Sequence, residues 1–127
     1  MRKTISFPVD KNFKDQLLLW ASQFDNVCYL NSNSEDAGNA KRINDHIMYS
    51  CLVGVGAAAE ITPHENSFEA FRSFHKKQND WLFGFFTYDL KNEIEKLSSN
   101  NHDGLQYPLL HFFQPRYIFN VNEKSVE

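Results

Sequence analysis

In residues 81–97 an apolar run passes one glycine and continues into an amphipathic helical pattern. The run itself, residues 81–86, is too short to cross a bilayer and predicts a buried strand. Gly84 interrupts it, and a glycine inside a strand indicates a bulge or the close approach of another backbone. Asp89 follows at the strand-to-helix corner, where we expect it to act as the N-cap of the next helix.

The pattern after this corner predicts a helix with two distinct faces. Leu90, Ile94 and Leu97 recur at helical spacing and predict an apolar face that packs on the core. The intervening positions predict a polar face, which consists of Lys91, Glu93, Glu95 and Lys96.

The rest of the chain alternates between strands and helices. Apolar or alternating runs predict strands at residues 2–7, 27–30, 47–55, 109–113 and 116–121, the last two separated by Pro115. Residues 57–61 either continue the strand at residues 47–55 or bend away from it. Helical periodicity predicts helices at residues 10–24 and 66–77. The first helix is expected to be capped by Asp10 or Asn12, and the second by a capping box of Asn66 and Glu69. The expected core face of the first helix consists of Phe13, Leu17, Trp20 or Ala21, and Phe24.

Single and paired strands interspersed with helices predict a mixed α+β domain. The expected architecture is a largely antiparallel β-sheet sandwich with packed helices, as one domain over residues 1–127. Near the end of the chain, residues 122–124 look like a hairpin turn without a returning strand. An unpaired aromatic strand would be an aggregation-prone edge, so we expect the chain to be part of a longer protein.

Composition excludes several classes of function. The net charge is −3 and no basic stripe is present, which argues against nucleic-acid binding. Cys28 and Cys51 lie in apolar contexts and are expected to be buried, reduced thiols. We find no targeting or transmembrane segment in the sequence, so we expect a cytoplasmic location without membrane contact.

The candidate chemical motifs are weak. Gly54 and Gly56 follow a strand as in a phosphate-binding loop, but Pro63 leaves no room for the helix that such a loop begins, so we expect a close-packed strand. The five histidines are scattered and none has zinc-ligand spacing to a cysteine or carboxylate. His102 and Asp103 have no nucleophile near them in sequence. The residues therefore predict no catalytic group, no metal site and no cofactor in this chain.

The segment FGFFTYDLKNEIEKL resembles a signature of the N-terminal domain of the anthranilate synthase and para-aminobenzoate synthase component I family. Gly84, Tyr88 and Asp89 match the Gly-aromatic-x-x-Tyr-Asp core, where we expect them to have structural roles. The continuation Asp-Leu-Lys-Asn-Glu, with Asp103-Gly-Leu and Pro108, is similar to the para-aminobenzoate (aminodeoxychorismate) synthase branch of Bacteroidetes-type bacteria. The resemblance runs over most of the chain.

This resemblance implies a supporting role. In the family, component I converts chorismate and ammonia to 4-amino-4-deoxychorismate for folate synthesis. It uses Mg²⁺, and a glutamine amidotransferase partner, component II, supplies the ammonia. The catalytic and metal-binding residues lie in a C-terminal chorismate-binding domain on which the N-terminal domain packs. The surface of this chain that meets such a domain is expected to be apolar.

The resemblance also implies an L-tryptophan pocket, since some members hold tryptophan in the N-terminal domain. The matching positions here are Ser32, His46, Ile47, Met48 and Tyr49. The family glutamate before the serine is replaced by Asn31, so a carboxylate that would pair with the amino-acid ammonium is missing. The family arginine is likewise replaced by Met48.

Two alternatives remain open at the sequence level. The chain is also similar to the N-terminal domain of an anthranilate synthase component I, which differs in product. Alternatively, it is a free-standing module that binds an amino acid. The residues downstream of this domain, and the product formed by the whole protein, would separate these hypotheses.

Overall fold

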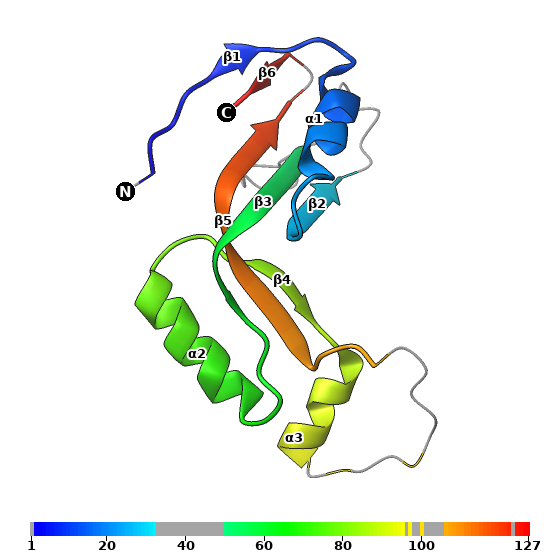
Figure 1. Cartoon of the computed structure of the whole chain (residues 1–127), viewed down its shortest axis with the longest axis vertical. Helices are drawn as coiled ribbons and strands as arrows, with labels where there is room; N and C mark the ends of the chain where they lie inside the picture. The colour runs from blue at the N-terminus through cyan, green and yellow to red at the C-terminus, as the bar shows by residue number, and fades with distance from the viewer. Residues whose placement is uncertain (1, 33–49, 96, 98–99, 101–105, 123) are drawn as a thin grey trace, which may run out of the picture. The chain divides into compact units, whose positions relative to one another are not determined.

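The chain has an α+β fold, described here from a computed structural model (Figure 1). The structure describes residues 2–32, 50–95, 97, 100, 106–122 and 124–127. Within them, six strands form one antiparallel sheet in the order β1-β6-β5-β3-β2, and β4 pairs with β5 beside this path. The predicted α+β class with an antiparallel sheet is thereby confirmed.

Contacts divide the chain into two compact units. Unit 1 comprises residues 1–56 and 116–127, and unit 2 comprises residues 57–115. Two long strands, β3 (Cys51–Ile61) and β5 (Leu110–Val121), contribute to both units.

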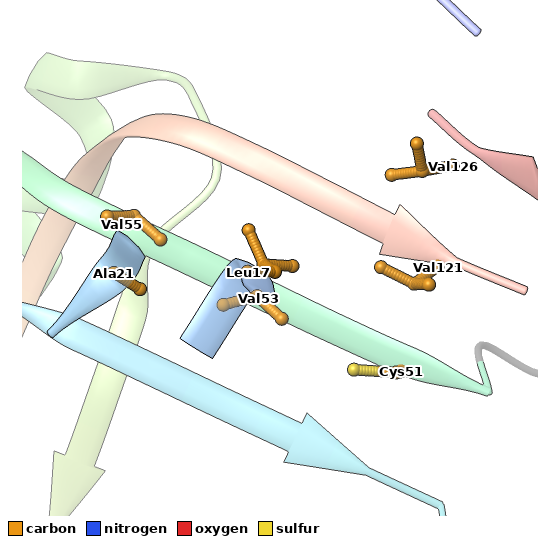
Figure 2. Close-up of a cluster of buried hydrophobic side chains, with 7 residues drawn as sticks. All are labelled: Leu17, Ala21, Cys51, Val53, Val55, Val121 and Val126. Atoms are coloured by element: carbon orange, nitrogen blue, oxygen red, sulfur yellow. The ribbon is translucent and has the colours of Figure 1, made fainter. Parts of the chain in front are cut away.

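Unit 1 is built around one amphipathic helix. α1 (Phe13–Ala21) turns Leu17 and Ala21 toward Val53 and Val55 of β3, as Figure 2 shows. β2 (Val27–Asn31) pairs antiparallel with β3. The buried core of the unit consists of Leu17, Ala21, Cys51, Val53, Val55, Val121 and Val126. The predicted face of the first helix is confirmed, because Phe13, Trp20 and Phe24 pack around this core.

The returning strand that the sequence appeared to lack is present. β6 (Ser125–Val126) follows a turn in which the Asn122 amide donates to the Ser125 carbonyl at 2.8 Å. It pairs with β5 on one side and with β1 (Phe7–Pro8) on the other. The prediction of an unpaired final strand was wrong because a two-residue strand is too short to give an alternating pattern.

Unit 2 packs α2 (Ser67–Gln78) against one face of its strands. β4 (Phe83–Phe86) leads into a 3₁₀ turn at Tyr88–Leu90 and then into α3 (Lys91–Glu95). The buried core of unit 2 consists of Leu90, Leu110 and Phe112, with Ile61, Phe71, Leu82 and Leu109 packed around it. The Phe71 ring contacts the Phe112 ring at a centroid distance of 4.6 Å, which fixes α2 on this face.

Two strand boundaries differ from the prediction. β5 continues through Pro115, which is fully buried, instead of breaking into two strands there. Pro115 lies between Phe113, the last residue of β5 that pairs with β4, and Val121, which pairs with β6, and its fixed φ is compatible with extended backbone. The opening strand, predicted at residues 2–7, is reduced to Phe7 and Pro8. β3 continues to Ile61, which is one of the two alternatives that the sequence left open.

Candidate functional site

The segment that carries the family resemblance begins with a close approach of two backbones. Gly84 in β4 lies opposite Phe112 in β5. A Cβ atom placed on Gly84 would lie 2.0 Å from the His111 carbonyl oxygen and 2.7 Å from the Phe112 Cα. Both neighbours are backbone atoms and cannot move aside as a flexible side chain can. The close approach predicted at Gly84 is present.

The strand-to-helix corner is held by Thr87 rather than by Asp89. Thr87 has extended backbone angles, φ −86° and ψ 159°, and occupies the N-cap position of the 3₁₀ turn. Its amide and its hydroxyl both donate to the Leu109 carbonyl, at 2.9 Å each. The Thr87 carbonyl in turn accepts from the Leu90 amide at 3.2 Å. These hydrogen bonds connect the corner to Leu109, the residue that directly precedes β5.

The prediction that Asp89 is the N-cap was therefore wrong. Asp89 lies inside the 3₁₀ turn and its side chain is exposed. An N-cap residue needs non-helical backbone angles, which Thr87 adopts two positions earlier. Asp89 still lies in the first helical turn, where a carboxylate interacts favourably with the free N–H groups.

A partly buried hydrogen-bonded pair joins the corner to α2. Ser67 is fully buried, and its amide donates to Glu93 Oε2 at 2.8 Å. Its hydroxyl donates to Glu93 Oε1 at 2.7 Å. Both carboxylate oxygens of Glu93 thus accept from the first residue of α2, where a helix has unpaired N–H donors. Glu93 caps α2 from another helix.

Two sequence predictions are corrected here. Asn66 adopts left-handed backbone angles, φ 49° and ψ 40°, and makes no side-chain cap bond. Glu69 pairs with Arg72 at 3.3 Å instead of completing a capping box. Glu93, placed on the solvent face by its periodicity, is half-buried. No local signal links Glu93 to Ser67, which lies 26 positions away.

The apolar face predicted for α3 is mostly exposed. Leu90 is buried, but Ile94 is 67% exposed and Leu97 is 50% exposed. Tyr88 is 82% exposed, and the Lys91 ammonium lies 4.7 Å from its ring centroid. Because the short helix turns Glu93 inward, its one apolar residue, Ile94, is exposed. Ile94, together with Tyr88 of the 3₁₀ turn and Leu97 beyond the helix, is called the α3 surface below.

Ser32, the first residue of the expected tryptophan pocket, makes sheet-end contacts. Its amide and its hydroxyl donate to the Ser50 carbonyl, at 3.0 Å and 3.1 Å. The Ser50 hydroxyl donates to the carbonyl of Val121. The other pocket positions, His46, Ile47, Met48 and Tyr49, lie outside the described residues. The structure therefore describes one of the five positions, and the hydrogen bonds of that residue hold it at the end of the sheet.

The cysteines are free thiols, as predicted, with Cys51 fully buried and Cys28 half-buried. Burial raises the pKa of the Cys28 thiol. A hydrogen bond with Cys51, together with burial and nearby acidic groups, raises the pKa of Tyr29 to about 12. Cys51 and Tyr29 lie in the core of unit 1 with residues of α1 and support packing rather than thiol chemistry.

The other candidate motifs have structural positions. Gly54 and Gly56 lie within β3, and Gly56, with φ +69°, has the Phe24 side chain 3.2 Å from where a Cβ would be. This is the close-packed strand that the sequence predicted. The His111 ring pairs with the Thr62 hydroxyl at 2.8 Å.

Comparisons add no relative to this picture: no protein-family model, curated protein or solved structure matches the chain. Among the described residues, no group of three or more His, Cys, Asp or Glu side chains is arranged to hold a metal ion. None of the described helices is long and apolar enough to cross a membrane.

Proposed function

We propose that this chain is the non-catalytic N-terminal domain of an aminodeoxychorismate synthase component I. The whole protein would convert chorismate and ammonia to 4-amino-4-deoxychorismate in the cytoplasm. The resemblance of the segment from Gly84 to Leu97 supports this reading. The observation that carries it is the α3 surface, which belongs to the same segment and is exposed although it is apolar.

The argument from the α3 surface is energetic. An amphipathic helix ordinarily buries its apolar stripe, because each aliphatic side chain gains about 1.5–3 kcal/mol on full burial. Here Glu93 takes the inward position and Ile94 and Leu97 lose that gain. Exposed apolar residues that lie close together in the chain, as Ile94 and Leu97 do, are candidates for a surface that binds another protein. A supporting domain that packs on a catalytic domain needs such a surface.

The proposal assigns the chemistry to the companion domain. The described residues offer no metal-binding group, so they do not fit the Mg²⁺ that the family uses, and no catalytic step is placed on them. Chorismate, Mg²⁺ and the ammonia from a glutamine amidotransferase component II would meet on the C-terminal chorismate-binding domain. The role of this chain is to support that domain.

L-tryptophan binding is a separate part of the proposal. The Ser32 hydroxyl already donates its proton to the Ser50 carbonyl, so that proton is not available to a ligand. With Asn31 in place of a carboxylate, binding is expected to be weak. Calorimetric titration of the chain with L-tryptophan tests it, and no heat at millimolar ligand would reject it.

The test of the main proposal uses the full-length protein with its amidotransferase partner, chorismate, glutamine and Mg²⁺. Formation of 4-amino-4-deoxychorismate is expected. Release of anthranilate and pyruvate would reject the proposal in favour of anthranilate synthase. A gene that encodes no chorismate-binding domain would reject both.

A variant on the α3 surface tests the supporting role. In the full-length protein, Ile94→Asp is expected to lower activity because it places a charge in the domain interface. In the isolated chain the same change should leave the unfolding midpoint almost unaltered, since Ile94 is exposed. Ser73→Asp on the exposed side of α2 is the control and should leave activity unaltered. Full activity of Ile94→Asp would show that the α3 surface does not meet the companion domain.

A further inference from the structure

The open edge of β4 is a second unpartnered feature of unit 2, distinct from the α3 surface. β4 pairs antiparallel with β5 along one side, from Phe83 opposite Phe113 to Phe86 opposite Leu110. Within the described residues no strand pairs with its other side. In Figure 1, β4 lies beside β5 as the outer strand of this part of the sheet.

The direction of the backbone groups on β4 follows from one hydrogen bond. The Thr87 amide donates to the Leu109 carbonyl at 2.9 Å, which makes this a hydrogen-bonded pair of the ladder. In antiparallel pairing the bonded positions alternate, so Phe85 and Phe83 also bond to β5. The N–H and C=O groups of Gly84 and Phe86 therefore point away from β5, toward the open edge.

The side chains next to this edge are aromatic and exposed. The sequence predicted a buried strand here, yet only Phe83 is buried. Phe85 is 41% exposed, Phe86 is 49% exposed and Trp81 is 44% exposed. Tyr107, whose ring contacts that of Phe85, is 65% exposed. β4 carries no charged residue and no proline, which are the usual protections of an edge strand.

We propose that a second copy of this chain pairs with the open edge, β4 to β4, in antiparallel orientation. A two-fold axis at Phe85 brings Gly84 of each copy opposite Phe86 of the other. The outward groups of these residues then form a self-complementary set of hydrogen bonds. The two Phe85 side chains are then neighbours across the axis.

The exposed area sets the strength of this dimer. At about 200 Å² for each aromatic side chain, the exposed parts of Trp81, Phe85, Phe86 and Tyr107 amount to roughly 400 Å² per copy. A stable interface takes about 800 Å² from each partner. The dimer is therefore weak and dissociates on dilution. It does not use the α3 surface, so it is independent of the proposed function.

Charge substitution at the two-fold axis tests the pairing. Sedimentation velocity of the wild-type chain over a wide concentration range is expected to show a reversible monomer–dimer equilibrium. Phe85→Lys should raise the dimer dissociation constant at least tenfold, because like charges then face each other. An equimolar mixture of Phe85→Lys and Phe85→Glu should restore dimers as heterodimers. Tyr88→Lys, at a more exposed aromatic position off the axis, is the control and should dimerise like wild type.

Each outcome decides the proposal, provided that circular dichroism shows every variant to be folded. Wild-type chain that stays monomeric at millimolar concentration would overturn it. Phe85→Lys that dimerises like wild type would also overturn it, as would loss of dimers in Tyr88→Lys alone, which would move the contact to the α3 surface. Heterodimers formed only by the mixed charges would establish that the two Phe85 positions face each other in the dimer.

Discussion

Replacing Glu93 by alanine should destabilise the chain far more than its place on a short, partly exposed helix suggests. The carboxylate accepts two hydrogen bonds from Ser67, at 2.8 Å from the amide and 2.7 Å from the hydroxyl. Hydrogen bonds to a charged group contribute about 1.5–3 kcal/mol each. Ser67 is fully buried, so both donors would be left without water. Because Glu93 is itself half-buried, solvent offsets part of the sum, and we expect a net loss of about 2–4 kcal/mol.

Urea unfolding followed by circular dichroism measures this loss. Glu95→Ala is the matched control on the same helix, and its exposed side chain should change the free energy of unfolding by less than about 0.5 kcal/mol. In a double-mutant cycle, Ser67→Ala and Glu93→Ala should show a coupling energy of at least about 1 kcal/mol. Equal effects of Glu93→Ala and Glu95→Ala would refute the inter-helix cap.

Three further predictions concern the corner and the core. In thermal melts, Gly84→Ala should cost about 3 kcal/mol or more, because its methyl group meets backbone atoms. Gly56→Ala, whose methyl group would meet a side chain at φ +69°, should cost about 1–2 kcal/mol. A larger loss of stability for Gly56→Ala than for Gly84→Ala would contradict the close approach of the β4 and β5 backbones. Thr87→Val should lower the Tm more than Asp89→Ala; a larger effect of Asp89→Ala would restore that residue as the cap. Since the pKa of Tyr29 is raised from 10 to about 12 in the folded chain, its contribution to stability is complete below pH 10 and is lost as the pH rises toward 12. Tyr29→Phe should remove this part of the Tm–pH profile, and a profile equal to that of the wild type would contradict the shift.

Features that depend on local geometry were predictable from the sequence. The spacing of Leu17 and Ala21 places both on one face of a helix whatever lies beside it, and that face is the one buried in unit 1. The close backbone approach at Gly84 is predictable for a similar reason. A glycine adds no packing to an apolar strand, so its presence there indicates that another backbone lies close.

The candidate site was less predictable, because its decisive contacts join distant segments. The periodicity of α3 correctly separates Glu93 from Ile94, but it does not show which face lies inward. That choice depends on Ser67, whose buried donors need an acceptor that α2 itself does not supply. The tryptophan-type pocket stays a prediction, since four of its five positions lie outside the described residues.

The sequence by itself determined the α+β class, the core face of α1 and the close backbone approach at Gly84. Each of these follows from side-chain periodicity or from the size of a single residue. Only the tertiary structure decided that Thr87 holds the corner, that β5 continues through Pro115, and that the aromatic strand β4 lies at an edge. An apolar run shows that burial is favourable, but whether a strand lies inside the sheet or at its edge depends on the number of partners it finds.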